Sequence, residues 1–284
     1  MEYFNIAGLN LQVEGADYPY FHKRMDKYRT DKFEKPDISV KFILDNLIDT
    51  EHPQHFAKSK GRYYFESCDG YGFYDYIDEI KKTVSIMKTN KDWNNITYTF
   101  SDLSTLFGIE PEFEVTNVLG HLFSESLRHF DGVVVHASTI VYKGKAVTFT
   151  APSGTGKSTH TGLWKQFYPD TVVINDDMPA IRLIDGKFYA YGTPWSGKTD
   201  INENISAPLE AMVFIERAES CSITEISPMD AVIRMIREIP VTVFKGQTDL
   251  MIDMFNKLFS NVPAYLLKCN ISKDAVDTVI NKLF

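Results

Sequence analysis

The sequence predicts a protein of mixed α/β class, α+β overall, and three observations support this. The first 130 residues contain short stretches in which apolar and polar residues alternate, separated by turn residues. From residue 131 onward, apolar strands and helical patterns follow one another. A glycine-rich loop joins one of these strands to a helix. We therefore expect a smaller, mainly antiparallel α+β region at 1–130 and a mixed-sheet domain at 131–284.

The composition is that of a folded protein with a substantial core. Apolar residues make up 44% of the 284 residues, with 20 Phe and 15 Tyr. The net charge of −8 argues against nucleic acid as the main partner, although it permits a local pocket for one polyphosphate. The three cysteines have no paired spacing, and neither a secretory signal nor a membrane-length apolar stretch is visible. We expect a cytoplasmic protein with no membrane partner.

The N-terminal region is expected to form an antiparallel sheet with one long helix. The alternating stretches that predict strands lie at 3–13, 37–44, 62–67, 82–88 and 95–100. Turn residues occur at 67–72 and 89–95, and a short helix is expected at 19–28. A second helix is expected at 111–129, where Pro111 suits the first turn. Its apolar stripe consists of Val115, Leu119, Leu122, Phe123 and Leu127.

The C-terminal region begins with a strand over 132–142, a hairpin turn at 143–145 and a strand over 145–150. The glycine-rich loop and a helix follow. The remaining predicted strands lie at 171–176, 179–184, 188–192, 208–218 and 263–269. The remaining predicted helices lie at 227–239, with a serine cap, at 248–260 and at 272–284.

The glycine-rich loop, Ala151 to Ser158, has the pattern of a phosphate-binding loop except that Ala151 replaces its first glycine. Gly154 and Gly156 allow backbone N–H groups to turn inward toward an anion. The helix that begins near Lys157 adds its positive N-terminal end. Lys157 can reach terminal phosphates, and the Ser158 hydroxyl can ligate Mg²⁺. The alternative is a tight strand-to-helix turn with a purely structural role, but such a turn would not require the Gly-Lys-Ser sequence.

Two aspartates lie at the end of the strand predicted over 171–176, where a nucleotide-binding fold needs a metal ligand. One aspartate suffices for that task, so the pair Asp176 and Asp177 indicates that one binds Mg²⁺ and the other takes a proton from an attacking hydroxyl. The alternative is an Asx turn at the end of a strand.

Two further sets of residues are candidates. His136 ends the predicted strand segment "VVVH" and, taken by itself, is better explained as a buried, hydrogen-bonded core histidine. In the loop 191–200, Trp195 and Lys198 are not required for turning, and they could cover a nucleotide or grip a substrate. A loop with a purely structural role is the alternative.

The order "HAST", hairpin, "APSGTGKST" and "NDD" resembles the C-terminal catalytic domain of HPr kinase/phosphorylase, a family that shares its fold with phosphoenolpyruvate carboxykinases. The resemblance covers about residues 131–217. "YGTPWSGK" is more similar to HPr-kinase-related proteins, and the first 130 residues do not resemble the N-terminal domain of true HPr kinases.

The resemblance implies roles for particular residues. The expected nucleotide-binding residues are Ser153, Gly154, Thr155, Gly156, Lys157, Ser158 and Thr159. Ser158 and Asp177 would ligate Mg²⁺, and Asp176 would be the general base. His136 would lie near the transferred phosphate, and Lys157 would join Asp176 and His136 in catalysis.

The expected function is therefore a Mg·ATP-dependent kinase that transfers the γ-phosphoryl group to a hydroxyl, either a serine of a protein or peptide or a small molecule. One alternative is a carboxykinase that decarboxylates a keto acid, and another is a non-catalytic nucleotide-binding regulator. The N-terminal region could recognise the acceptor or only cover the sheet. The resemblance also suggests a homo-oligomer.

Overall fold

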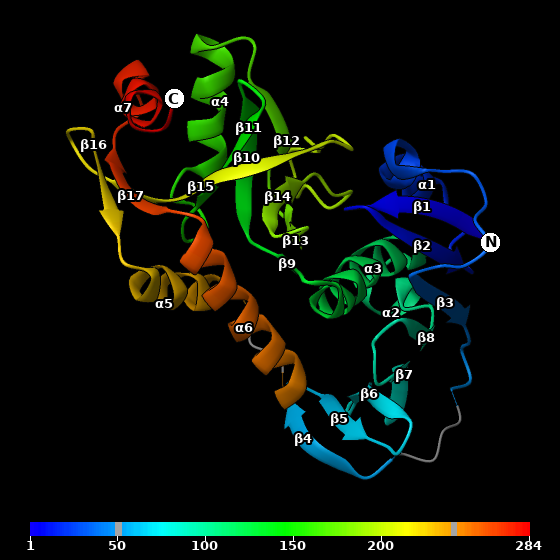
Figure 1. Ribbon diagram of the computed structural model, residues 1–284. Coiled ribbons are helices and arrows are strands. Elements are labelled where there is room, and N and C mark those ends of the chain that lie inside the picture. The colour runs from blue at the N-terminus through cyan, green and yellow to red at the C-terminus, as the bar shows by residue number, and fades with distance from the viewer. Residues whose placement is uncertain (49–52, 240–242) are drawn as a thin grey trace. The chain divides into compact units, whose positions relative to one another are not determined.

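The computed structural model describes residues 1–48, 53–239 and 243–284 (Figure 1). The chain divides into two compact units, Met1–His129 and Phe130–Phe284. Each unit contains its own mixed sheet together with helices, so the protein is of mixed α/β class.

The first unit is built on an eight-stranded sheet with the order β1-β2-β3-β8-β7-β6-β5-β4. Its strands are β1 (Glu2–Ile6), β2 (Leu9–Glu14), β3 (Ile38–Leu44), β4 (His55–Ser59), β5 (Arg62–Glu66), β6 (Gly70–Ile77), β7 (Lys82–Asn90) and β8 (Asn95–Phe100). The pairs β2–β3 and β3–β8 are parallel, and the other pairs are antiparallel. Short turns between consecutive strands account for the antiparallel pairs.

Two expectations for this sheet were wrong in detail. The stretch 3–13 is a hairpin rather than one strand, because Ala7 and Gly8 take positive φ values of 52° and 76° and reverse the chain. The predicted turn at 67–72 is shorter, since β6 already begins at Gly70. There a Cβ atom would lie 1.8 Å from the Thr89 carbonyl oxygen, so this glycine permits close strand approach rather than turning.

The helices of the first unit are α1 (Pro19–Met25), α2 (Ser104–Phe107) and α3 (Pro111–Leu127), with short 3-10 turns at Asp26–Tyr28 and, beside the unit boundary, Arg128–Phe130. Pro111 occupies the first turn of α3, as predicted. All five residues of the predicted apolar stripe are buried. The helix contacts α1 and β3, so its apolar face covers the sheet.

The second unit is built on a nine-stranded mixed sheet. Its strands are β9 (Gly132–Val134), β10 (Ala137–Tyr142), β11 (Lys145–Thr150), β12 (Val172–Asn175), β13 (Ala180–Ile184), β14 (Lys187–Tyr191), β15 (Ser206–Arg217), β16 (Ser222–Ile226) and β17 (Ala264–Cys269). The main order is β12-β10-β11-β15-β14-β13-β9, and β17 pairs with β15 and β16. Because β11, β15 and β17 are parallel neighbours, their carboxyl ends lie along the same edge.

Helices cover both faces of this central sheet (Figure 1). They are α4 (Lys157–Phe167), α5 (Pro228–Glu238), α6 (Lys245–Asn261) and α7 (Lys273–Leu283). Along β15, Val213 packs in the cluster that contains α4 and α7, whereas Met212 and Phe214 pack in the cluster that contains α5 and α6. This alternation explains why the predicted strand was almost wholly apolar, since both of its faces are buried.

Three sequence expectations for this unit differ from the structure. The predicted strand 132–142 is two strands, β9 and β10, because the chain leaves its pairing with β13 and enters the β11–β12 part of the sheet. His136 lies at this break. Helix α6 begins three residues before the predicted Thr248, and β16 had not been predicted. The other helices lie close to their predicted positions, and Ser227 caps α5 by accepting a hydrogen bond from the Asp230 backbone N–H.

None of the helices in the described part of the chain has both the length and the apolar character to cross a membrane.

Candidate functional site

The glycine-rich loop lies between the end of β11 and the start of α4, as the sequence predicted. Gly154 and Gly156 have φ values of +78° and +122°, which residues with a Cβ atom rarely adopt. No side chain of the described residues caps the N-terminus of α4. The first backbone N–H groups of the helix therefore remain available to an anion held by the loop.

Lys157 is the first residue of α4, and its side chain turns back beneath the loop. Its Nζ donates a hydrogen bond to the Ala151 carbonyl at 2.8 Å and lies 2.9 Å from Nε2 of His136. The residue is buried, and burial lowers the pKa of its ammonium group, while Glu238, Asp177 and Asp176 act in the opposite direction. The structure thus holds the lysine side chain inside a cavity lined by polar residues.

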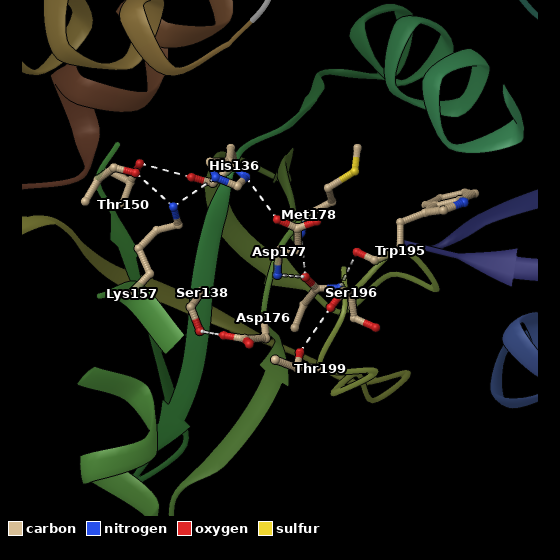
Figure 2. A network of polar contacts seen from close by, with 12 residues as sticks. His136, Ser138, Thr150, Lys157, Asp176, Asp177, Met178, Trp195, Ser196 and Thr199 are labelled. Atoms are coloured by element: carbon tan, nitrogen blue, oxygen red, sulfur yellow. Dashed lines mark hydrogen bonds and ion pairs between the residues drawn. The ribbon is translucent and has the colours of Figure 1, made fainter. Parts of the chain in front are cut away.

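His136 connects Lys157 to the acidic pair. Its Nδ1 lies 3.0 Å from Oδ1 of Asp177, and its Nε2 faces the lysine, so the ring bridges the two side chains (Figure 2). This pattern assigns the ring hydrogen to Nδ1 and leaves Nε2 as an acceptor. The break between β9 and β10 places the ring here, because it frees residue 136 from the ladders on either side.

Asp176 is buried, and its two carboxylate oxygens have different surroundings. Oδ1 accepts a 2.7 Å hydrogen bond from Ser138 (Figure 2). The Ser138 hydroxyl also contacts Thr161 of α4 at 2.9 Å. Oδ2 has no hydrogen-bond partner among the described residues. A buried carboxylate oxygen without a partner is costly, so its presence favours a ligand or ion as the missing partner.

The turn after β12 fixes both aspartates. Oδ1 of Asn175 accepts hydrogen bonds from the backbone N–H groups of Asp177 and Met178, at 2.8 and 2.7 Å. The Asx turn proposed as the structural alternative is therefore present, but Asn175 forms it. Both aspartate side chains are left to face the loop and His136.

A second loop closes the site from the opposite side. Ser196, Gly197, Lys198 and Thr199 line the same cavity as Asp177. Gly197 has a φ of +61°, and a Cβ atom there would lie 2.9 Å from Oδ2 of Asp177. The glycine therefore permits the loop to approach the carboxylate closely.

This close approach gives a first prediction. Gly197→Ala should lower the free energy of unfolding by more than Gly144→Ala, measured by urea denaturation. Gly144 also has a positive φ, but a Cβ atom there meets nothing within 4 Å. Its substitution therefore reports backbone strain alone, about 1–2 kcal/mol. Equal losses in the two variants would show that Asp177 accommodates the new methyl group without cost.

The predicted site residues surround a cavity of about 490 Å³. Its lining residues are His136, Ser153, Gly154, Gly156, Lys157, Ser158, Thr159, Asp176, Asp177, Ser196, Gly197, Lys198, Thr199 and Arg217. Two predicted residues are placed elsewhere: Thr155 lines a neighbouring cavity, and Trp195 is buried outside the lining. The Trp195 carbonyl accepts a hydrogen bond from the Asn175 side chain, so this residue supports the Asx turn.

Arg217 is a site residue that the sequence analysis missed. It ends β15, and its guanidinium donates to the carbonyl oxygens of Gly154 and Thr155 at 2.5 and 2.8 Å. These bonds hold the carbonyls away from the cavity side on which an anion would bind. Ser138 and Thr161 were also missed. Each is a polar residue in an otherwise buried segment, and this is the signal that could have identified them.

The donor set at the site suits Mg²⁺, which needs few protein ligands. Among the described residues there is no group of three or more His, Cys, Asp or Glu side chains able to hold a metal. Mg²⁺ usually takes one or two carboxylates and completes its shell with phosphate oxygens and water. Asp177 and the Ser158 hydroxyl supply this kind of set in one cavity.

Comparisons with known proteins identify a family and distant likenesses to solved structures. No curated protein matches this chain. The solved structure of the Hpr(Ser) kinase/phosphatase from Coxiella burnetii is similar over 52% of this chain and 89% of that chain, with 11% sequence identity and a TM-score of 0.33. The family model described as SynChlorMet cassette protein ScmC matches residues 113–284, more than half of the sequence. The chain therefore belongs to the ScmC family.

Proposed function

We propose that this protein is a Mg·ATP-dependent phosphotransferase that moves the γ-phosphoryl group to a hydroxyl of a protein, peptide or small molecule. The supporting observation is the cavity in which the glycine-rich loop, the buried Lys157 and the pair Asp176–Asp177 face one another. Phosphoryl transfer depends mainly on positioning and charge neutralisation, and these residue types supply both.

The loop and Lys157 bind the phosphates of the donor. Backbone N–H groups from Gly154 to Ser158 face the β-phosphate, and the start of α4 adds its positive end. A lysine ammonium has three donors. Contacts with Ala151 and His136 engage two of them, and the third is directed to a phosphate oxygen as negative charge develops there.

Asp176 takes the proton of the acceptor hydroxyl. Ser138 holds Oδ1, so Oδ2 is the oxygen that accepts the proton while the new O–P bond forms and the bond to the leaving diphosphate breaks. Asp177 and Ser158 would hold Mg²⁺, which when bound neutralises phosphate charge. Lys198 lines the cavity on the side of the acidic pair and is suited to bind an anionic group of the acceptor.

The direct test is to incubate the full chain with γ-labelled ATP, Mg²⁺ and a panel of free serine, serine peptides and candidate proteins. Transfer of label to a hydroxyl is the expected result. Absence of transfer together with absence of magnesium-dependent ATP binding would end the proposal. Turnover of oxaloacetate would instead support the carboxykinase alternative.

Ser138 is expected to be a positioning residue in this reaction. Ser138→Ala should lower kcat by about 10–100-fold, the range expected for a lost hydrogen bond to a charged group, and leave KM for ATP nearly unchanged. The matched control is Thr139→Val, which removes a buried hydroxyl from the next position of β10, where Thr139 bonds Thr148. Steady-state kinetics of both variants would decide, and a KM effect without a kcat effect would contradict this role.

A further inference from the structure

A second cavity of about 400 Å³ lies beside the glycine-rich loop. It lies at the carboxyl ends of β15 and β17, next to the first turns of α4. The two strands are parallel neighbours, so these ends lie at the same edge of the sheet. Its apolar lining consists of Leu163, Ile215, Ala218, Cys269 and Ile271. Cavities of this size and character bind small organic ligands.

The two cavities share part of their walls. Gly156, Thr159 and Arg217 line both the apolar cavity and the cavity of the acidic pair. One molecule can therefore have its phosphates at the loop and its remaining part in the apolar cavity. Arg217 fixes the shared wall because its guanidinium is bonded to the loop carbonyls of Gly154 and Thr155.

The apolar cavity is suited to an uncharged ring. Among the described residues that line it, Arg217 is the one with a permanent charge. Burial lowers the pKa of His160 to about 4 and raises the pKa of the Cys269 thiol to about 11, so both side chains are neutral at pH 7. A phosphate group would lose hydration here, and the guanidinium of Arg217, the one counter-charge among the described lining residues, is already bonded to the carbonyls of Gly154 and Thr155. An aromatic base would instead bury its faces against aliphatic side chains.

His160 supplies an independent observation. Its Nε2 accepts a 3.1 Å hydrogen bond from the indole N–H of Trp164, so Nδ1 has the ring hydrogen. That Nδ1 is buried and has no hydrogen-bond partner among the described residues. An unpaired donor in a residue that lines a cavity favours a ligand with acceptor atoms, and nucleobases have ring nitrogens and carbonyl oxygens of this kind.

We infer that the apolar cavity binds the base of a nucleoside triphosphate, and that the phosphoryl donor is a nucleotide rather than an inorganic polyphosphate. This inference rests on the proposed function, because it assigns the phosphates of the same molecule to the glycine-rich loop. The base contributes affinity through burial of apolar surface, independently of the charges that hold the phosphates.

Calorimetric titration of the full chain with Mg·ATP and with magnesium tripolyphosphate tests this inference. Unmodified protein should bind ATP at least about tenfold more tightly, which corresponds to burial of about 60 Å² of apolar surface. Ala218→Trp, which fills the cavity, should remove this advantage while tripolyphosphate affinity stays within about twofold. Ser220→Trp places the same side chain at an exposed position outside the cavity lining and should retain the tighter binding of ATP.

The outcomes separate the two proposals. Equal binding of ATP and tripolyphosphate by the unmodified protein would overturn the base-binding cavity and leave the phosphate site standing. Failure of both ligands to bind would overturn the proposed function itself. Ile271→Ala is a second cavity variant in case Ala218→Trp does not fold. Ile271 is 76% exposed, so its truncation should leave the fold intact and weaken the binding of ATP but not of tripolyphosphate. An unchanged ATP affinity in both cavity variants would contradict the location of the base.

Discussion

Lys157→Ala is expected to abolish measurable phosphoryl transfer, with a fall in kcat of at least about 10²–10³-fold. The ammonium group is buried at the base of the loop, where solvent screens it weakly, so its interaction with phosphate charge is strong. Arg217, which also lines the cavity, cannot replace it because its guanidinium is bonded to the loop carbonyls. The measurement is transfer of label from γ-labelled ATP under saturating Mg²⁺.

The matched control is Lys165→Ala, which removes an exposed lysine from the last turn of the same helix. This variant should retain activity within about twofold, as expected for a surface position. Thermal unfolding of both proteins shows whether α4 remains folded. Near-normal turnover by a folded Lys157→Ala protein would contradict the role assigned to the loop.

Asp176→Asn is expected to remove turnover while nucleotide binding is retained. The amide keeps the shape and can still contact Ser138, but it cannot accept a proton from the acceptor. General base catalysis contributes about 10²–10⁴-fold, so kcat should fall by this factor. The affinity for Mg·ADP, measured by calorimetry, should change by only a few-fold, because Asp177 and the loop remain.

Asp170→Asn controls for the loss of one negative charge, since Asp170 is exposed in the turn before β12. It should leave both kcat and nucleotide affinity unchanged. This pair of variants also tests the non-catalytic alternative. A regulator that only binds nucleotide would show no transfer of label even as the unmodified protein, and the Asp176→Asn substitution would then have no turnover to remove.

Local sequence features predicted much of the second unit. The glycines of the loop, the helix after it and the hairpin turns at Lys143–Gly144 and Asp185–Gly186 all depend on φ preferences and periodicity within a few residues. The same reasoning placed α3 and its buried stripe in the first unit. It failed where a local pattern allows two structures, as at residues 3–13, where alternation continues through a tight turn.

The partners of Asp176 and of the glycine-rich loop could not be predicted in this way. Ser138 is 38 residues from Asp176, and Arg217 is 63 residues from Gly154. These contacts exist because β10 pairs with β12 and β11 pairs with β15. No short-range preference in the sequence encodes either pairing.

The sequence alone determined that this chain has a glycine-rich loop followed by a helix that begins with a lysine, since Gly154, Gly156 and Lys157 specify that conformation and charge over neighbouring residues. Only the tertiary structure decided which side chains surround the loop, which oxygen of Asp176 lacks a partner among the described residues, and that an apolar cavity adjoins it. The physical reason is that backbone conformation is a local property, whereas burial and side-chain partners depend on how distant strands pair.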